Sequence, residues 1–215
     1  MTIILPLGIS FYIFLSLSYV IDIFTKKEKV NRNIVEVLLS LSFFPIILAG
    51  PIHRPASLIK QFQAKRVFRY HQIVMGLRKI LWGLFMKIVI ADNCAVFTAD
   101  IFERFDQYNG STLLLGGILY TIQIYADFAG YSEIAIGTSN LLGFEIIRNF
   151  NYPYFAKDIT DFWKRWHISL TLWFRDYVFL PFTFLISRKL PAQKTFHINT
   201  DYIIYASGIA LTWTL

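Results

Sequence analysis

A histidine, two cations and a hydroxyl recur at helical spacing in one short stretch of an otherwise apolar chain. Residues 161–177 read DFWKRWHISLTLWFRDY. If this stretch is one helix, four polar side chains follow steps of three, four and four residues along one face: Lys164, His167, Thr171 and Arg175. The imidazole could accept the proton of an attacking hydroxyl. The cations could hold phosphates of an acyl donor or stabilise negative charge on a thioester oxygen. Both the nearby cations and desolvation disfavour the protonated imidazole, so the histidine would stay neutral.

A membrane interface offers a second interpretation of the same stretch. Tryptophan, lysine, arginine and histidine gather where helices enter a bilayer, because amphipathic rings and long cations lie at headgroup depth. Trp163, Trp166 and Trp173 lie beside the polar stripe. Interface belts are commoner than active sites, so composition alone favours the interface interpretation.

A second polar group lies in YTIQIYADFAGYSEIAIG, inside a long apolar segment. Its candidate site residues are Gln123, Asp127, Tyr131 and Glu133. Two carboxylates in such a segment require an interior position, because an ionised group facing lipid costs several kcal/mol. They could line a tunnel, orient a histidine or pair with a cation of residues 73–97. The alternative for Asp127 is a structural ion pair, for example with Lys87.

Few other residues suggest a site. Cys94 is the single cysteine, which excludes an internal disulfide and a cysteine-based metal site, and we predict no bound metal. We expect His53, His71 and His197 to be solvated or at the interface rather than ligands. No metalloprotease, nucleophile-elbow or phosphate-loop motif is present, which argues against hydrolase and nucleotidase activity.

The composition is typical of a protein embedded in a bilayer. Of 215 residues, 55% are hydrophobic and 16% are charged, and the mean hydropathy is +0.49, whereas soluble domains carry about 25% charged residues. The net charge of +7 is expected to reflect cytoplasmic loops and lipid headgroups. No nucleic-acid-binding motif accompanies that charge, so nucleic acid is not an expected partner. We therefore predict an all-α, polytopic membrane protein in which residues 1–215 form one membrane-embedded domain.

Apolar segments alternate with polar loops along the chain. They span residues 5–24, 34–52, 73–97, 113–144, 168–186 and 202–215. Pro45, Gly50 and Pro51 interrupt the second segment and cations flank both its ends, so either it is re-entrant or one basic stretch lies on a cavity. The fourth segment fits one tilted helix or two helices broken near Gly130. We expect broken or re-entrant helices, with polar residues on them that could line a tunnel. The loop TADIFERFDQYNG, poor in lysine and arginine, is expected on the outer side.

In these stretches the chain resembles the membrane-bound O-acyltransferase family, and especially its branch that O-acetylates alginate and other bacterial exopolysaccharides. The resemblance rests on LPLGISFYIFLSLSYVIDIF, FFPIILAGPIHRP, GLRKILWGLFMKIVIADN, YTIQIYADFAGYSEIAIG and LLGFEIIRNFNYPYFAKDITDFWKRWHISLTLWFRDYVFLP. These motifs follow the family's order and cover about residues 5–182.

The resemblance implies a multi-pass protein of the bacterial cytoplasmic membrane, surrounded by membrane lipids and crossed by a funnel or tunnel. An acetyl group would pass from a cytoplasmic acyl thioester, expected to be acetyl-CoA, to hydroxyls of a cell-surface polysaccharide such as alginate. The transfer would be direct or through a periplasmic or extracellular acetyl-handling partner, with no bound cofactor. The family's WHxSL histidine falls on His167, and its DFxGYSxxAxG stretch falls on residues 127–137, which would help to line the interior.

One feature of the family is missing from this sequence. The family places another histidine, often regarded as the primary catalytic one, in a later WHG-type motif, and this chain ends at ALTWTL without it. The start near LPLGISF likewise falls inside the family's pattern, so we expect a partial domain that lacks earlier spans and the WHG-motif helices. His167 is then expected to act as a base or as an assisting group. A membrane transporter, a scaffold subunit of a polysaccharide-modification complex and an inactive truncated product are the alternatives.

Overall fold

The computed structural model describes residues 8–48, 50–188 and 200–214, and every regular element within these ranges is a helix. The prediction of an all-α protein is confirmed. The chain divides into two compact units, Met1–Asn151 and Tyr152–Leu215. A single membrane-embedded domain and a central tunnel stay predictions.

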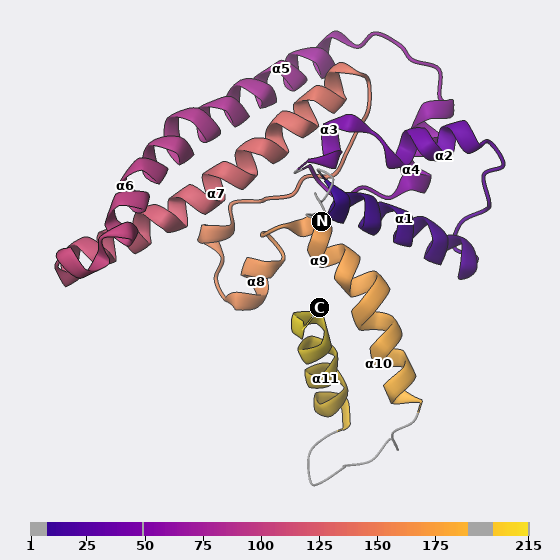
Figure 1. Cartoon of the computed structure of the whole chain (residues 1–215). Helices are drawn as coiled ribbons and strands as arrows, with labels where there is room; N and C mark the ends of the chain where they lie inside the picture. Colours follow the sequence, from indigo (N-terminus) through magenta and orange to yellow (C-terminus); the bar gives the residue numbers. More distant parts are fainter. Residues whose placement is uncertain (1–7, 49, 189–199, 215) are drawn as a thin grey trace, which may run out of the picture. The chain divides into compact units, whose positions relative to one another are not determined.

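The unit Met1–Asn151 contains a long antiparallel helical hairpin (Figure 1). The first arm consists of α5 (Tyr70–Leu84), the π-helical segment η1 (Phe85–Ala91) and α6 (Asp92–Glu103), and the second arm is α7 (Gly110–Leu141). The arms contain 34 and 32 residues, and both are long and apolar enough to cross a membrane. The second arm is one continuous helix and is not broken near Gly130.

Two reciprocal pairs of glycines hold the arms of the hairpin close together. Gly76 faces Gly137, and Gly83 faces Gly130. A Cβ atom added to Gly137 would lie 2.5 Å from the carbonyl oxygen of Gly76, and one added to Gly83 would lie 2.5 Å from that of Gly130. The two helices therefore contact each other backbone to backbone, as small residues permit in membrane helices. Gly130 serves this contact rather than a helix break.

Both ends of α7 are set by side-chain or backbone geometry. The side chain of Asn109 accepts a hydrogen bond from the N–H of Thr112 at the N-terminus. At the C-terminus Gly143 has φ +81°, a left-handed conformation that glycine adopts without steric cost. The N–H of Phe144 then donates to the carbonyl of Ser139 at 2.8 Å. This turn directs the chain away from the helix axis.

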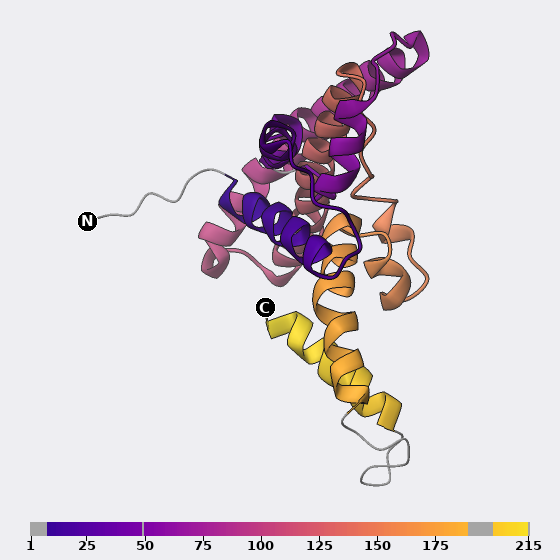
Figure 2. The ribbon, with the colours of Figure 1, turned by 90° about the vertical axis from the view of Figure 1, so that its right-hand side faces the viewer.

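Shorter helices complete this unit. They are α1 (Ile9–Phe24), α2 (Ile34–Leu41), α3 (Phe44–Ile47), α4 (Pro55–Gln63) and the 3₁₀ turn η2 (Phe105–Gln107). Helices α1, α2 and α4 contact one another, and α3 packs against α7 (Figures 1 and 2). The predicted break in the second apolar segment is confirmed, because Phe43 separates α2 from α3 and packs on Phe144 with ring centroids 4.7 Å apart.

The unit Tyr152–Leu215 contains two helical rods that lie side by side (Figures 1 and 2). Its elements are η3 (Pro153–Phe155), α8 (Ile159–Trp163), α9 (Ile168–Phe174), the π-helical segment η4 (Arg175–Phe179), α10 (Leu180–Ser187) and α11 (Thr200–Thr214). The first rod runs through α9, η4 and α10, and the second rod is α11. Gly208 lets them approach, since a Cβ atom there would lie 2.7 Å from the ring of Phe179.

Candidate functional site

A turn divides the stretch of residues 161–177, so the prediction of one continuous helix was wrong. Helix α8 ends at Trp163, and α9 begins at Ile168. His167 directly precedes α9 with φ +41° and ψ +54°, in the left-handed region. Histidine is among the non-glycine residues found there most often, but the conformation still costs about 1 kcal/mol or more. The strained residue is the candidate catalytic one.

Contacts between residues four apart stabilise the turn that follows α8. The ring of Trp166 stacks on that of Phe162, with centroids 5.6 Å apart and planes inclined by 16°. An ion pair between Arg165 Nε and Asp161 Oδ1, 2.9 Å long, lies beside it. Both contacts also occur within a helix, so the left-handed conformation of His167, not these contacts, ends the helical path. Offset stacking of this kind contributes about 0.5–1.5 kcal/mol.

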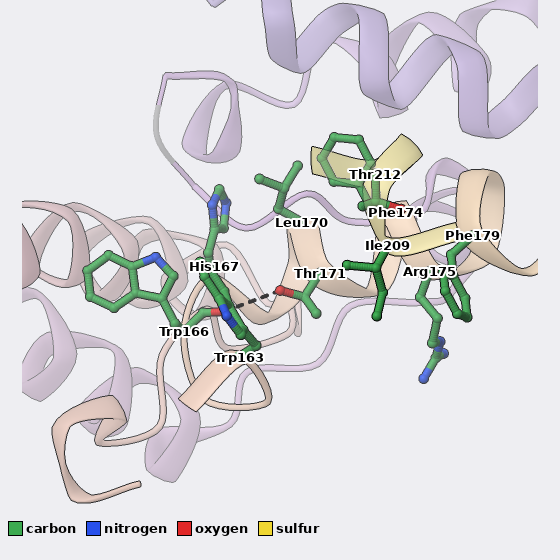
Figure 3. Close-up of a pocket in the computed structure, with 10 residues that line it drawn as sticks. All are labelled: Trp163, Trp166, His167, Leu170, Thr171, Phe174, Arg175, Phe179, Ile209 and Thr212. Atoms are coloured by element: carbon green, nitrogen blue, oxygen red, sulfur yellow. Dashed lines mark hydrogen bonds between the residues drawn. The ribbon is translucent and has the colours of Figure 1, made fainter. Parts of the chain in front are cut away.

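His167 lines a cavity of about 420 Å³ (Figure 3). The walls come from the end of α8, the turn that follows it, α9, η4 and α11: Trp163, Trp166, His167, Leu170, Thr171, Phe174, Arg175, Phe179, Ile209 and Thr212. Three members of the predicted stripe, His167, Thr171 and Arg175, therefore share one cavity. The fourth member, Lys164, is exposed and absent from the lining, because the turn removes it from the axis of α9.

The chemistry of this cavity is set by burial at one end and by charge at the other. In Figure 3 His167 and Arg175 lie at opposite ends of the lining. Burial lowers the pKa of His167 to about 4, so the imidazole is neutral at neutral pH. The Nε of Arg175 contacts Asp176 Oδ1 at 2.8 Å, and its side chain is 54% exposed. A mostly apolar cavity with a neutral base at one end and a cation at the other can hold a small acyl group attached to an anionic carrier.

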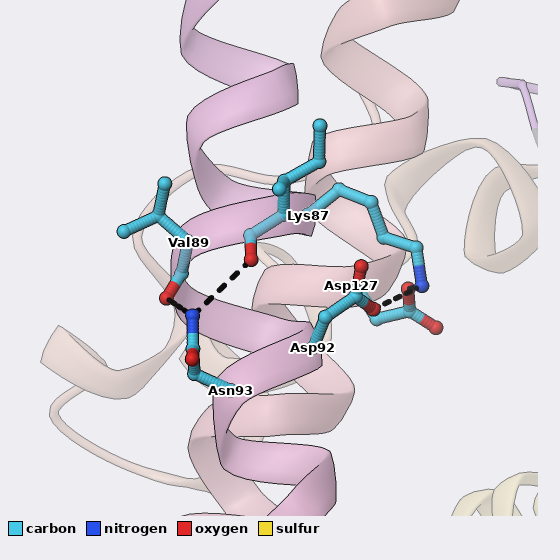
Figure 4. Close-up of polar contacts among 6 residues, drawn as sticks. Lys87, Val89, Asp92, Asn93 and Asp127 are labelled. Carbon is cyan, nitrogen blue, oxygen red and sulfur yellow. Dashed lines mark hydrogen bonds and ion pairs between the residues drawn. The ribbon is translucent and has the colours of Figure 1, made fainter.

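Lys87 joins the two arms of the hairpin in unit Met1–Asn151 (Figure 4). Its Nζ lies 2.7 Å from Asp127 Oδ1 and 2.7 Å from Asp92 Oδ1. The side chain of Lys87 is 31% exposed and that of Asp127 46% exposed. The predicted pairing of Asp127 with Lys87 is confirmed, but the pair is half exposed rather than buried. One cation between two carboxylates leaves one negative charge in excess, which favours contact with water or with a further cation.

The other residues of the second polar group lie along α7. Glu133 pairs with Lys79 at 2.8 Å, which confirms the prediction that a carboxylate pairs with a cation of the third segment. Gln123 accepts a hydrogen bond from the hydroxyl of Thr98. Tyr131 is 44% exposed and is absent from the lining of the cavity that contains His167. The structure thus distributes these residues along the hairpin and does not gather them into one site.

One prediction for the remaining histidines was wrong. His53 is buried, with 6% of its surface exposed, and neither ring nitrogen has a hydrogen-bond partner among the described residues. Burial lowers its pKa to about 4. Pro51 and Pro55, on either side of His53, are also buried. The polar residues of this stretch did not indicate that its histidine would be buried. His71 is exposed as predicted, and His197 lies outside the described residues.

Sequence reasoning missed the contribution of α11 and of the π-helical segments. Ile209 and Thr212 of α11 close the cavity beside His167, and nothing in their local sequence points to that role. The spacing of Lys87 and Asp92 could have indicated the π-helical segment, because the two residues are five apart and π-helical hydrogen bonds join residues five apart. Asn93 donates to the carbonyl of Val89 at 2.8 Å in the same segment (Figure 4). Within the described ranges, no group of three or more His, Cys, Asp or Glu side chains is placed to hold a metal.

Comparison with known proteins gives consistent matches over most of the chain. The model of the membrane-bound O-acyltransferase family matches residues 15–196. The chain is 40% identical over 178 residues to the probable alginate O-acetylase AlgI of Azotobacter vinelandii, covering 83% of this chain and 35% of that protein. It is 33% identical to the peptidoglycan O-acetyltransferase of Helicobacter pylori, over 83% of this chain and 39% of that protein. It is 34% identical to the teichoic acid D-alanyltransferase of Bacillus subtilis, over 85% of this chain and 47% of that protein. The chain thus spans between about a third and a half of the length of these curated relatives.

Proposed function

Because the chain belongs to the membrane-bound O-acyltransferase family, we propose that it forms part of an enzyme that transfers an acetyl group from a cytoplasmic acyl thioester to hydroxyls of a cell-surface polysaccharide. The observation that carries this proposal is the cavity in which a half-buried, neutral His167 and a half-exposed Arg175 face a mostly apolar space. Acetyl-CoA is the proposed donor, and it is a substrate rather than a resident cofactor.

The residues of the cavity support a simple reaction sequence. A ring nitrogen of His167 accepts the proton of the acceptor hydroxyl while the hydroxyl oxygen bonds to the carbonyl carbon of the thioester. The carbon–sulfur bond then breaks, and the imidazolium returns the proton to the departing thiolate. Arg175, at the other end of the cavity, orients an anionic part of the donor. A pKa near 4 makes His167 a weak base, which favours an assisting role beside a second base.

The names of the relatives support a small acyl group and an envelope polymer as acceptor. They describe transfer of acetyl or D-alanyl groups to alginate, peptidoglycan or teichoic acid. The 40% identity to the alginate O-acetylase favours acetyl and an exopolysaccharide of the alginate kind for this chain. We propose that the acetyl group crosses the membrane and reaches the acceptor either directly or through a periplasmic or extracellular acetyl-handling partner.

The charges at the two ends of the hairpin support a defined orientation in a bacterial cytoplasmic membrane. Lys65, Arg66 and Arg69 precede α5, whereas the α6–α7 connection, residues 104–109, carries Arg104 as its one lysine or arginine. Positively charged loops remain cytoplasmic. The start of α5 and the end of α7 are therefore proposed to face the cytoplasm in a multi-pass protein, and the half-exposed ions around Lys87 to face a hydrated passage.

The proposal is tested by acetyl content in cells. The gene for the whole protein is expressed with His167→Ala, with His167→Gln, or with the control substitution His71→Ala at an exposed histidine outside the cavity. Acetyl groups per sugar are measured on the purified polymer, and protein in membranes is measured by immunoblot. Both His167 variants should lose most acetylation at unchanged membrane levels, and His71→Ala should retain it. Full acetylation by both His167 variants would refute the role of His167 and would favour a transporter or scaffold.

A further inference from the structure

A second cavity, of about 460 Å³, lies in unit Met1–Asn151 where the hairpin meets its neighbouring segments. Four parts of the chain line it: α4, the link of residues 64–69 that leads into α5, Gln72 in the first turn of α5, and the residues that follow α7. The cavity is separate from the one that contains His167, and none of the candidate site residues lines it.

Contacts between distant segments fix the walls of this cavity. The side chain of Gln61 makes two hydrogen bonds with the backbone of Glu145, donating to its carbonyl at 2.9 Å and accepting from its N–H at 2.8 Å. Arg66 Nη1 donates to the carbonyl of Leu142 at 2.6 Å. The guanidinium of Arg66 also lies 3.7 Å from the ring centroid of Phe144. The link and the segment after α7 are therefore held together before any ligand binds.

The cavity carries an excess of positive charge. Lys65, Arg66 and Arg69 line it, against the single carboxylate of Glu145. Within the described ranges, neither Lys65 nor Arg69 forms an ion pair or a side-chain hydrogen bond. Arg66 keeps its full charge and its remaining N–H donors after bonding to a carbonyl. A fixed cavity with two unengaged cations and a third that is already positioned favours a bound anion.

Large apolar side chains alternate with these cations, in the order KRVFRY. Val67, Phe68 and Tyr70 are 67%, 77% and 74% exposed. Tyr70 is also the first residue of the 34-residue apolar arm of the hairpin. Exposed rings and free cations next to the end of a membrane helix are typical of the boundary between headgroups and acyl chains. These neighbours favour an anion that carries an apolar tail over a soluble one.

We propose that this cavity binds the phosphate of an anionic phospholipid, with Lys65 and Arg69 as its cationic contacts, Arg66 as a positioned third donor, and Val67 and Phe68 among the acyl chains. The lipid holds the link against the end of the hairpin on the cytoplasmic side. This proposal goes beyond acyl transfer and does not depend on the role of His167.

The test uses the purified protein in detergent, with native mass spectrometry to count retained phosphatidylglycerol or phosphatidylcholine. The variant Lys65→Gln/Arg69→Gln removes the two unengaged cations and leaves Arg66 in place. The control Lys29→Gln/Arg32→Gln removes the same charge from an exposed loop outside the cavity. Thermal melting in detergent without added lipid checks that both variants fold.

Wild type and control should retain phosphatidylglycerol in preference to phosphatidylcholine. The cavity variant should bind phosphatidylglycerol about 25-fold more weakly, because each cation near an anionic lipid contributes about fivefold. Glycerol 3-phosphate and inorganic phosphate in excess should not displace the lipid. Equal retention by the cavity variant and the control would overturn the proposal. Displacement by either soluble phosphate compound would also overturn it, in favour of a soluble phosphate ligand.

Discussion

Substitution of one glycine in α7 tests the backbone contact that holds the hairpin together. In Gly137→Ala the new Cβ atom would lie 2.5 Å from the carbonyl oxygen of Gly76 and 3.0 Å from the backbone nitrogen of Ile80. Ordinary contact begins at 3.4 Å, so the helices must separate locally by about 0.9 Å. A gap of that size forfeits about a quarter to a half of the dispersion energy of each contact along the seam.

The magnitude follows from two opposing effects. Overpacking of this kind costs about 3 kcal/mol at the upper end of its range, while alanine gains about 1 kcal/mol of helix propensity over glycine. Gly137→Ala should therefore destabilise the protein by about 2 kcal/mol. Gly117→Ala is the matched control in the same helix, because nothing lies within 4 Å of its added Cβ atom. It should be stabilising by about 1 kcal/mol.

The assay is thermal unfolding of both variants in detergent, followed by tryptophan fluorescence. A difference of about 3 kcal/mol between them corresponds to a Tm difference of about 10 °C for a chain of this size. Equal melting temperatures for Gly137→Ala and Gly117→Ala would show that the two arms do not contact each other through their glycines.

Three further predictions concern ionisable and strained groups. His167→Gly should melt no lower than wild type, because glycine relieves the positive φ of +41°, yet should lose acetyl transfer as His167→Ala does. The pKa of His53 is lowered from 6.5 to about 4 in the folded protein, so on acidification this histidine is protonated in the unfolded chain at a higher pH than in the folded one. Unfolding free energies from denaturant titrations should therefore fall by about 3 kcal/mol between pH 7 and pH 4, and His53→Phe should reduce that slope. Lys87→Met leaves Asp92 and Asp127 without their cation and should cost about 1–2 kcal/mol in the same titration at pH 7, whereas adding Asp127→Asn should recover part of the loss.

The ion pairs that join the two arms of the hairpin were predictable from the sequence. A carboxylate in a long apolar helix needs a cation, and the only candidates nearby in the hairpin were lysines and arginines of the preceding segment. Lys79 and Lys87 indeed pair with Glu133 and Asp127. The length of the apolar stretch also predicted α7, although its glycines left open a break near Gly130.

The turn before His167 could not be predicted from periodicity. The spacing of the polar stripe fits a helix without fault, and the left-handed conformation of His167 is what excludes one. The second cavity was hidden for a related reason. Its walls depend on a hydrogen bond from Arg66 to Leu142, 76 residues further along the chain, which no local pattern encodes.

Acyl transfer by the purified whole protein in a single turnover tests the role of His167 most directly. Enzyme in excess is mixed with acetyl-CoA and an oligosaccharide acceptor, and release of free thiol is followed with acceptor present and absent. His167→Gln should slow transfer by about 10²-fold or more, the usual contribution of a group that moves a proton, while donor affinity stays within about twofold. A wild-type transfer rate in His167→Gln would contradict the account, because the cavity would then hold no group that the reaction requires.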